Sequence, residues 1–234
     1  YFKQRPLMPM RLIAHTLPVS GILTAMVTGA AFSTLVELAE VYAISVARYP
    51  PLVVGALLTT QLVGIAVAAW LFKVALGSRW LPILAFGGLA VVAAAAALLL
   101  TLSPSTAHIV VPIAGLLLGF GAGAGVTPAL FMAGLSAPST KLGPTFALVE
   151  LLRSVAAFLV APILLHLAQT GGDLPAGIGR AATITLVILV GGGAAAVTVL
   201  LLGGKRPHAP DLETWLDGDT PAYDSPRFAA AIRS

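Results

Sequence analysis

Residues 80–102 read WLPILAFGGLAVVAAAAALLLTL and contain no charged side chain. An α-helix needs about 20 mainly apolar residues to cross the roughly 30 Å hydrocarbon core of a bilayer, and this stretch is long enough to do so. Five further apolar stretches lie near 17–47, 51–75, 109–135, 143–168 and 181–203. The sequence therefore predicts an all-α membrane protein, built as a bundle of six transmembrane helices.

The composition of the 234-residue chain supports this fold class. Hydrophobic residues make up 58% of the chain and charged residues 9%, and the mean hydropathy is +0.99. A water-soluble domain of this length cannot bury so much apolar surface. The chain has no cysteine, which excludes disulfides, thiolate metal ligands and a cysteine nucleophile.

The distribution of Lys and Arg between the loops predicts the orientation, because cytoplasmic loops of membrane proteins retain positive charge. One set of loops and termini carries Lys3, Arg5, Arg11, Lys73, Arg79, Lys141, Lys205 and Arg206. The charged residues of the other loops are Arg48, Asp173 and Arg180. Both termini are therefore expected in the cytoplasm. The basic balance of the chain is a topology signal, and a nucleic-acid partner is not expected.

Three parts follow from this pattern: a cytoplasmic lead-in at 1–16, the six-helix bundle at 17–203 and a soluble cytoplasmic tail at 204–234. The tail carries five of the nine acids of the chain and four prolines. Asp211 could cap one short helix through Leu216, and Ser225 with Pro226 could begin another. A largely disordered tail is the alternative.

Four charged residues lie inside the predicted spans, where an unpaired charge is costly and therefore marks a candidate functional site. Glu37 and Glu40 are three residues apart and share a helix face. Two carboxylates so close together cannot both ionise cheaply in a low dielectric, so one could carry a proton or hold a cationic substrate. The alternative for either residue is a purely structural role, with Glu40 reaching water at the headgroup level.

Glu150 and Arg153 are the other two charges, also one helical turn apart. The simplest interpretation is an ion pair within one helix that makes both tolerable in the membrane. Arg153 cannot lose its charge, so it could also bind a neighbouring helix or face a cavity. Gln61 is a candidate polar group of the cavity, although polar residues in membrane spans also join helices to one another.

Residues 115–128 read GLLLGFGAGAGVTP. Gly115, Gly119 and Gly123 repeat every four residues, which predicts a helix face that a neighbouring backbone can approach closely. Pro128 removes a helical hydrogen bond and predicts a kink that could serve as a gating element. A phosphate-binding loop is excluded, because no strand precedes the glycines and no Lys-Ser/Thr pair follows them.

The sequence does not support an enzyme. An intramembrane serine protease needs a serine in a glycine-rich turn and a histidine on another span, but the fourth span has no serine and the sixth has no histidine. His, Asp and Glu residues also show no spacing typical of a metal site. We therefore expect no catalysis, no metal and no cofactor.

In their order along the chain, these features resemble the last six helices of a major facilitator superfamily transporter, especially of the fourteen-helix drug:proton antiporter branch. The resemblance covers about residues 5–203. It is carried by the basic, proline-containing lead-in at 5–12, the glycine-rich helix ending in Pro128, and the segment from Gly143 to Arg153.

Two positions depart from the family pattern. The loop with Lys73 and Arg79 has the place and basic character of the family's Gly-x-x-x-Asp-Arg-x-Gly loop but lacks its Asp. Glu150 stands where the family usually has a small amide.

The resemblance implies the C-terminal half of a proton-coupled multidrug exporter that works by alternating access between two halves. Its partners would be membrane lipid, protons, a hydrophobic and in some cases cationic small molecule, and an N-terminal half in the same or a separate chain. The location would be the inner membrane of a bacterial cell, with Glu37 as the first candidate for coupling and Glu40 as the second. The alternative is a non-transporting scaffold subunit that packs through its glycine-rich helix and binds a partner through its tail.

Overall fold

The computed structural model describes residues 13–170, 172–204, 209–218 and 220–231, and within these residues the chain forms helices and loops but no β-strand. Six spans are long and apolar enough to cross a membrane, which confirms the predicted number. The fold is therefore all-helical and compatible with a multi-pass membrane protein. The lead-in motif at 5–12, and with it Lys3, Arg5, Arg11, Gly171, Lys205, Arg206 and Asp219, lie outside the described residues.

The six spans contain the following helices. The first is α2 (Thr16–Val41), continued by the π-helix η1 (Tyr42–Val46), and the second is α3 (Pro51–Leu58) followed by α4 (Thr60–Ala75). The third is α5 (Leu81–Leu99) and the fourth α6 (Ala107–Gly134). The fifth is the 3-10 turn η2 (Ser139–Lys141) with α7 (Leu142–Gln169), and the sixth is α8 (Leu174–Leu202). Two short helices, α9 (Leu212–Leu216) and α10 (Phe228–Ala231), follow in the tail.

The sixth span begins earlier than expected from hydropathy. The sequence places the sixth apolar stretch near 181–203, but α8 already starts at Leu174, with Pro175 in its first turn. Proline is well tolerated at that position, because its fixed φ suits a helix and the missing N–H would have no partner within the helix. Pro175 therefore marks the beginning of the helix rather than part of the loop.

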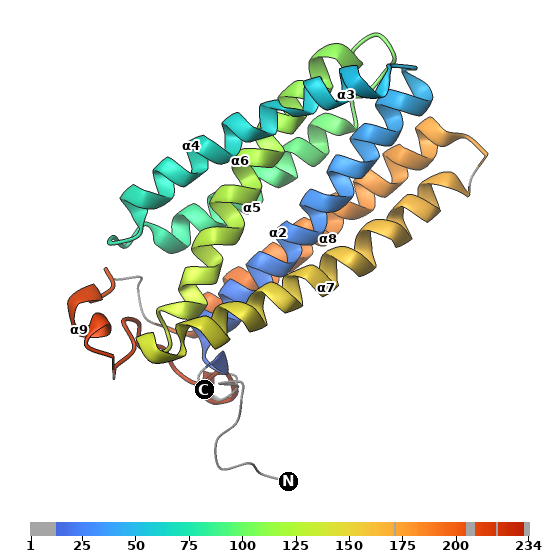
Figure 1. Cartoon of the computed structure of the whole chain (residues 1–234). Helices are drawn as coiled ribbons and strands as arrows, with labels where there is room; N and C mark the ends of the chain where they lie inside the picture. Colours follow the sequence, from blue (N-terminus) through green and yellow to red (C-terminus); the bar gives the residue numbers. More distant parts are fainter. Residues whose placement is uncertain (1–12, 171, 205–208, 219, 232–234) are drawn as a thin grey trace.

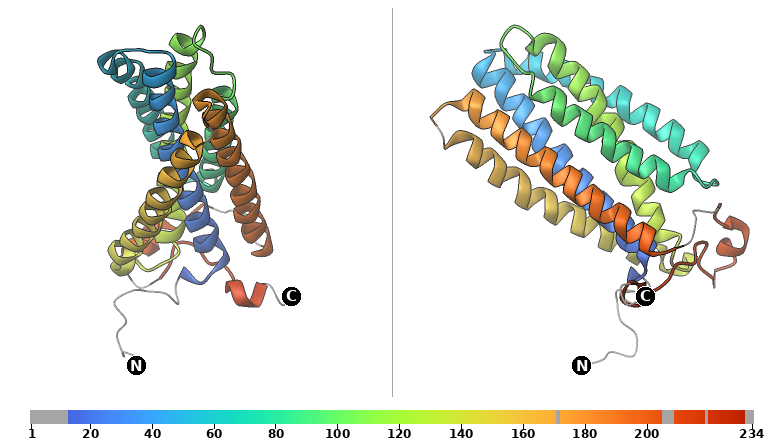
Figure 2. Two further views of the ribbon diagram at one scale, coloured as in Figure 1. Left: turned by 90° about the vertical axis from the view of Figure 1, so that its right-hand side faces the viewer. Right: turned by 180° about the vertical axis from the view of Figure 1, so that it is seen from behind.

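The spans are arranged around two central helices, α2 and α6, which contact each other (Figure 1). α2 also packs against α7 and α8, and α6 packs against α4 and α5. Figures 1 and 2 show α7 and α8 on one side of α2, and α4, α5 and α6 on the other. The terminal end of the bundle, defined here as the end that carries the start of α2 and the tail helices, lies opposite the α2–α3 connection.

Spans one to three and spans four to six form two three-helix units with matching contacts. The first span packs against the fifth and sixth, and the fourth span packs against the second and third, so exchanging the two units leaves these principal contacts unchanged. Two spans separate α2 from α6, so the two central helices run in opposite directions and the units are inverted with respect to each other. Such inverted repeats occur within each half of major facilitator transporters.

Candidate functional site

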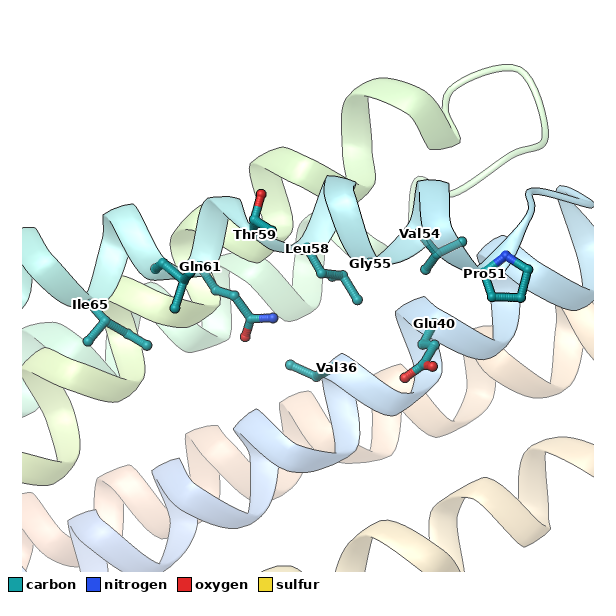
Figure 3. A pocket seen from close by; sticks show the side chains of 10 residues that line it. Val36, Glu40, Pro51, Val54, Gly55, Leu58, Thr59, Gln61 and Ile65 are labelled. Atoms are coloured by element: carbon teal, nitrogen blue, oxygen red, sulfur yellow. The ribbon is translucent and has the colours of Figure 1, made fainter.

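A cavity of about 430 Å³ lies between α2 and the second span (Figure 3). Small-molecule sites usually measure roughly 300–1,000 Å³ and are lined mainly by apolar side chains with a few polar groups. The polar side chains of this cavity are Glu40, Thr59 and Gln61, and the larger apolar ones are Val36, Val54, Leu58, Leu62 and Ile65. The cavity therefore has the size and lining of a site for a small apolar molecule.

Glu40 and Gln61 come from opposite walls of this cavity. Figure 3 shows the Gln61 amide directed from α4 toward α2, and Glu40 on the facing side of α2. Glu40 is exposed and Gln61 is half-buried. A carboxylate offers acceptors or a proton, and an amide offers both donors and an acceptor. Together they could bind a polar or positively charged group on an otherwise apolar molecule.

The wall opposite Glu40 is formed by the first half of the second span. Thr59, between α3 and α4, keeps right-handed helical dihedral angles (φ −61°, ψ −19°), and its Oγ1 donates a hydrogen bond to the Ala56 carbonyl at 2.7 Å, so the span continues through this residue. Thr60 Oγ1 donates to the carbonyl of Pro112 in α6 at 2.7 Å. This hydrogen bond joins the cavity wall to a neighbouring helix, a common role of polar residues in membrane spans.

Glu37 lies one turn before Glu40 but is not part of the cavity wall. Its side chain is half-buried on α2. The structure thus places Glu40, which the sequence ranked second, in contact with the cavity, and leaves Glu37 beside it on the same helix.

Glu150 and Arg153 form an ion pair within α7. Arg153 Nε donates to Glu150 Oε2 at 2.9 Å, and the Arg153 Nη2 group also contacts Glu150 Oε1. Neither residue lines the cavity. Their position agrees with mutual neutralisation, the simpler of the two interpretations of the sequence.

Gly29 of α2 is a packing position outside the cavity that was not singled out from the sequence. A Cβ added at Gly29 would lie 2.6 Å from Arg153 Cγ, so the arginine stem lies across the helix where a side chain is missing. Gly21, Ala25 and Gly29 repeat every four residues, and this small-residue spacing is the signal that could have indicated close packing on this face. The importance of Gly29 depends on the packing of α7 against α2, which the sequence does not show.

The glycine-rich face of α6 meets the second span. A Cβ added at Gly119 would lie 2.6 Å from the Cα of Gln61, which is backbone and cannot move independently. Added Cβ atoms at Gly115 and Gly123 would lie 2.8 Å from Thr60 Oγ1 and Ala68 Cβ. The same glycines that allow close packing therefore set the position of Gln61 in the cavity wall.

The remaining site candidates lie elsewhere. Pro128 is buried inside α6, which continues as a helix to Gly134. Lys73 and Arg79 are exposed near the α4–α5 loop, and the Arg79 guanidinium lies 5.6 Å from the Trp80 ring centroid. In the part of the chain that the structure describes, no group of three or more His, Asp or Glu residues could hold a metal ion.

Comparison with known proteins gives no match, whether with family models, with curated proteins or with solved structures. The resemblance to the major facilitator superfamily therefore stays a prediction, and the functional argument rests on the residues and geometry of this chain.

Proposed function

We propose that this chain is one half of a secondary active transporter that works by alternating access. The observation that carries the proposal is the inverted pair of three-helix units around α2 and α6. In transporters with such repeats, substrate and coupling ion bind near the middle of the membrane, and the bundles rock around that site. The cavity between α2 and the second span, which extends from Pro51 at the α2–α3 end of the bundle toward Ile65 nearer its middle, supplies a candidate site in this chain.

The proposed substrate is a hydrophobic small molecule, and a cationic one would suit Glu40. Its apolar part would contact Val36, Leu58 and Ile65, while Glu40 carries the proton or the substrate charge. Export and proton coupling are suggested by the sequence resemblance. Protons are the proposed coupling ion because Glu40 is the one ionisable side chain among the described lining residues.

The proposed partner is a second helical half, which would cover one side of this bundle, with membrane lipid around the rest. The second and fifth spans are the least buried, with 22% of their most apolar window enclosed. Both are therefore available for such contacts. We place the terminal end in the cytoplasm, because Lys73, Arg79 and Lys141 are exposed in the loops there. The proposed location in a bacterial inner membrane rests on the sequence resemblance.

We expect Glu40→Gln to abolish gradient-driven transport while the protein still folds, because the amide keeps the shape but cannot carry a proton. The measurement is efflux of ethidium, used as a lipophilic cation, from vesicles that contain the complete protein under an imposed pH gradient. The initial rate should fall to that of vesicles without the protein, because an essential intramembrane acid has been removed.

Glu213→Gln is the matched control, because Glu213 is an exposed acid on α9, far from the cavity. It should leave the rate unchanged. Full transport by Glu40→Gln would remove Glu40 from the mechanism, and loss of transport in Glu37→Gln alone would assign coupling to Glu37.

The scaffold alternative receives less support. It requires the tail to bind another protein, but the buried tail residues, Trp215 among them, already contact this chain's own bundle. It also gives no role to a carboxylate in an apolar cavity.

A further inference from the structure

The C-terminal tail is bound to the start of the first span by backbone hydrogen bonds. The Phe228 N–H donates to the Ala14 carbonyl at 3.0 Å, and the Thr16 N–H donates to the Pro226 carbonyl at 3.0 Å. These residues lie at the terminal end of the bundle (Figure 1). The end of the chain is thus joined to the beginning of its bundle.

The middle of the tail is bound to the connection between α6 and α7. The N–H groups of Ala222 and Tyr223 both donate to the Leu135 carbonyl, at 2.8 and 3.1 Å. Ala222 and Tyr223 are buried, at 8% and 4% exposure. Burial raises the pKa of Tyr223 to about 12, because the apolar surroundings disfavour the charged phenolate.

Trp215 on α9 is the apolar anchor of the tail. Its side chain is 8% exposed, and its Nε1 donates to the Ala137 carbonyl at 2.8 Å. It belongs to a buried cluster that includes Leu17 of α2, Leu81 of α5 and Ala133 of α6. A buried indole contributes a large apolar area and needs a partner for its N–H, and both conditions are met here.

The helix that carries Trp215 is capped in its first turn. The Asp211 carboxylate accepts hydrogen bonds from Thr214 Oγ1 at 2.7 Å and from the Thr214 N–H at 3.1 Å. These bonds lower the pKa of Asp211. Leu212 in the same turn contacts the position of Gly77 in the α4–α5 loop, at 3.9 Å from an added Cβ. The cap fixes the orientation of a helix that contacts two loops at once.

We propose that residues 209–218 and 220–231 act as a strap that holds the terminal ends of α2, α5 and α6 together as one rigid unit. Hydrogen bonds and apolar contacts from this segment reach all three helix ends, and they also reach the α4–α5 and α6–α7 loops. Rocking of a transporter half is largely a rigid-body motion, so it requires helix ends that move together. In this respect the role of the strap rests on the proposed function, whereas its docking does not.

The docking can be measured directly, because the chain has no cysteine of its own. Ala222→Cys introduces a thiol at a buried position of the strap, and Ala229→Cys introduces one at an exposed position of α10. In the complete protein in membranes, a membrane-impermeant maleimide should label Cys at 222 at least about tenfold more slowly than Cys at 229, because it must wait for local opening.

Trp215→Ala should remove this difference, whereas Leu216→Ala should not. Leu216 is the next residue on the same helix and is 71% exposed, so its truncation removes little packing. Equal labelling at 222 and 229 in the otherwise unchanged protein would overturn the docking. Protection at 222 that persists in Trp215→Ala would overturn the role of the indole as anchor.

A second measurement avoids the introduced thiol. Trypsin cleavage after Arg227 should be slow in the unaltered protein and faster in Trp215→Ala, because a protease needs the segment to detach first. Unchanged cleavage in Trp215→Ala would contradict the strap.

Transport then separates the two proposals. Ethidium efflux should fall severalfold in Trp215→Ala and stay unchanged in Leu216→Ala. A docked strap in a protein without any transport would reject the proposed function but leave the strap intact. Full transport by a Trp215→Ala protein whose strap is detached from the bundle would show that the strap has no role in rocking and would reject the inference.

Discussion

Gly119→Leu is expected to prevent the bundle from folding, whereas Gly87→Leu is expected to be tolerated. A Cβ at Gly119 would already overlap the backbone of Gln61, at 2.6 Å from its Cα. Extra methylenes in a packed core usually cost about 1–3 kcal/mol when side chains can move. Here a whole helix would have to shift, so the cost should exceed that range.

Gly87 is the matched control, because it lies on a membrane span and no atom lies within 4 Å of an added Cβ. The measurement is the yield of monodisperse protein after extraction in a mild detergent, followed by thermal unfolding. We expect little or no folded Gly119→Leu and near-normal Gly87→Leu. Normal folding of Gly119→Leu would mean that α4 and α6 are not packed at this point.

The second large effect is an asymmetry between the partners of the α7 ion pair. Glu150→Gln is expected to destabilise the protein more than Arg153→Met. Without Glu150 the guanidinium stays charged, because it cannot lose its proton under any physiological condition. Without Arg153 the carboxyl group can take up a proton and become neutral. The methionine also keeps an apolar stem over Gly29.

Removing one partner of a fully buried pair costs about 3–5 kcal/mol. The side chains of Arg153 and Glu150 are 25% and 47% exposed on the bundle, and inside a membrane span this part faces lipid or the proposed second half rather than water. The double variant Glu150→Gln/Arg153→Met should be more stable than Glu150→Gln alone, because it leaves no unpaired charge. Unfolding temperatures in detergent provide the comparison. Additive losses in the double variant would show that the two side chains do not stabilise each other.

The six spans could be predicted because the bilayer sets the length and polarity of each helix. The N-terminal cap of the short tail helix was also predicted from the sequence, and Asp211 does cap α9. The packing of the start of α4 against α6 was not predicted. It is accompanied by a bond from Thr60 to Pro112, which lies 52 residues away, and no local pattern shows such a partner.

The candidate site could be predicted only in part, for the same reason. A charge in an apolar span drew attention to Glu40, and a polar amide in another span drew attention to Gln61, as separate residues. Their position on opposite cavity walls depends on how α2 packs relative to α4, and the sequence contains no measure of this. Trp215 was assigned to a short helix, but its burial requires side chains from α2, α5 and α6 together.

Alternating access is the central claim, and thiol accessibility across the membrane tests it most directly without knowledge of the substrate. Val36→Cys places the only cysteine of the chain in the cavity wall, and Ala194→Cys places it on the exposed apolar surface of α8. In the complete protein, a membrane-impermeant maleimide should reach Cys at 36 from either side of the membrane. Reaction from one side should block later reaction from the other, while Cys at 194 should react from neither. Labelling of Cys at 36 from one side alone, under every ion gradient applied, would contradict the account.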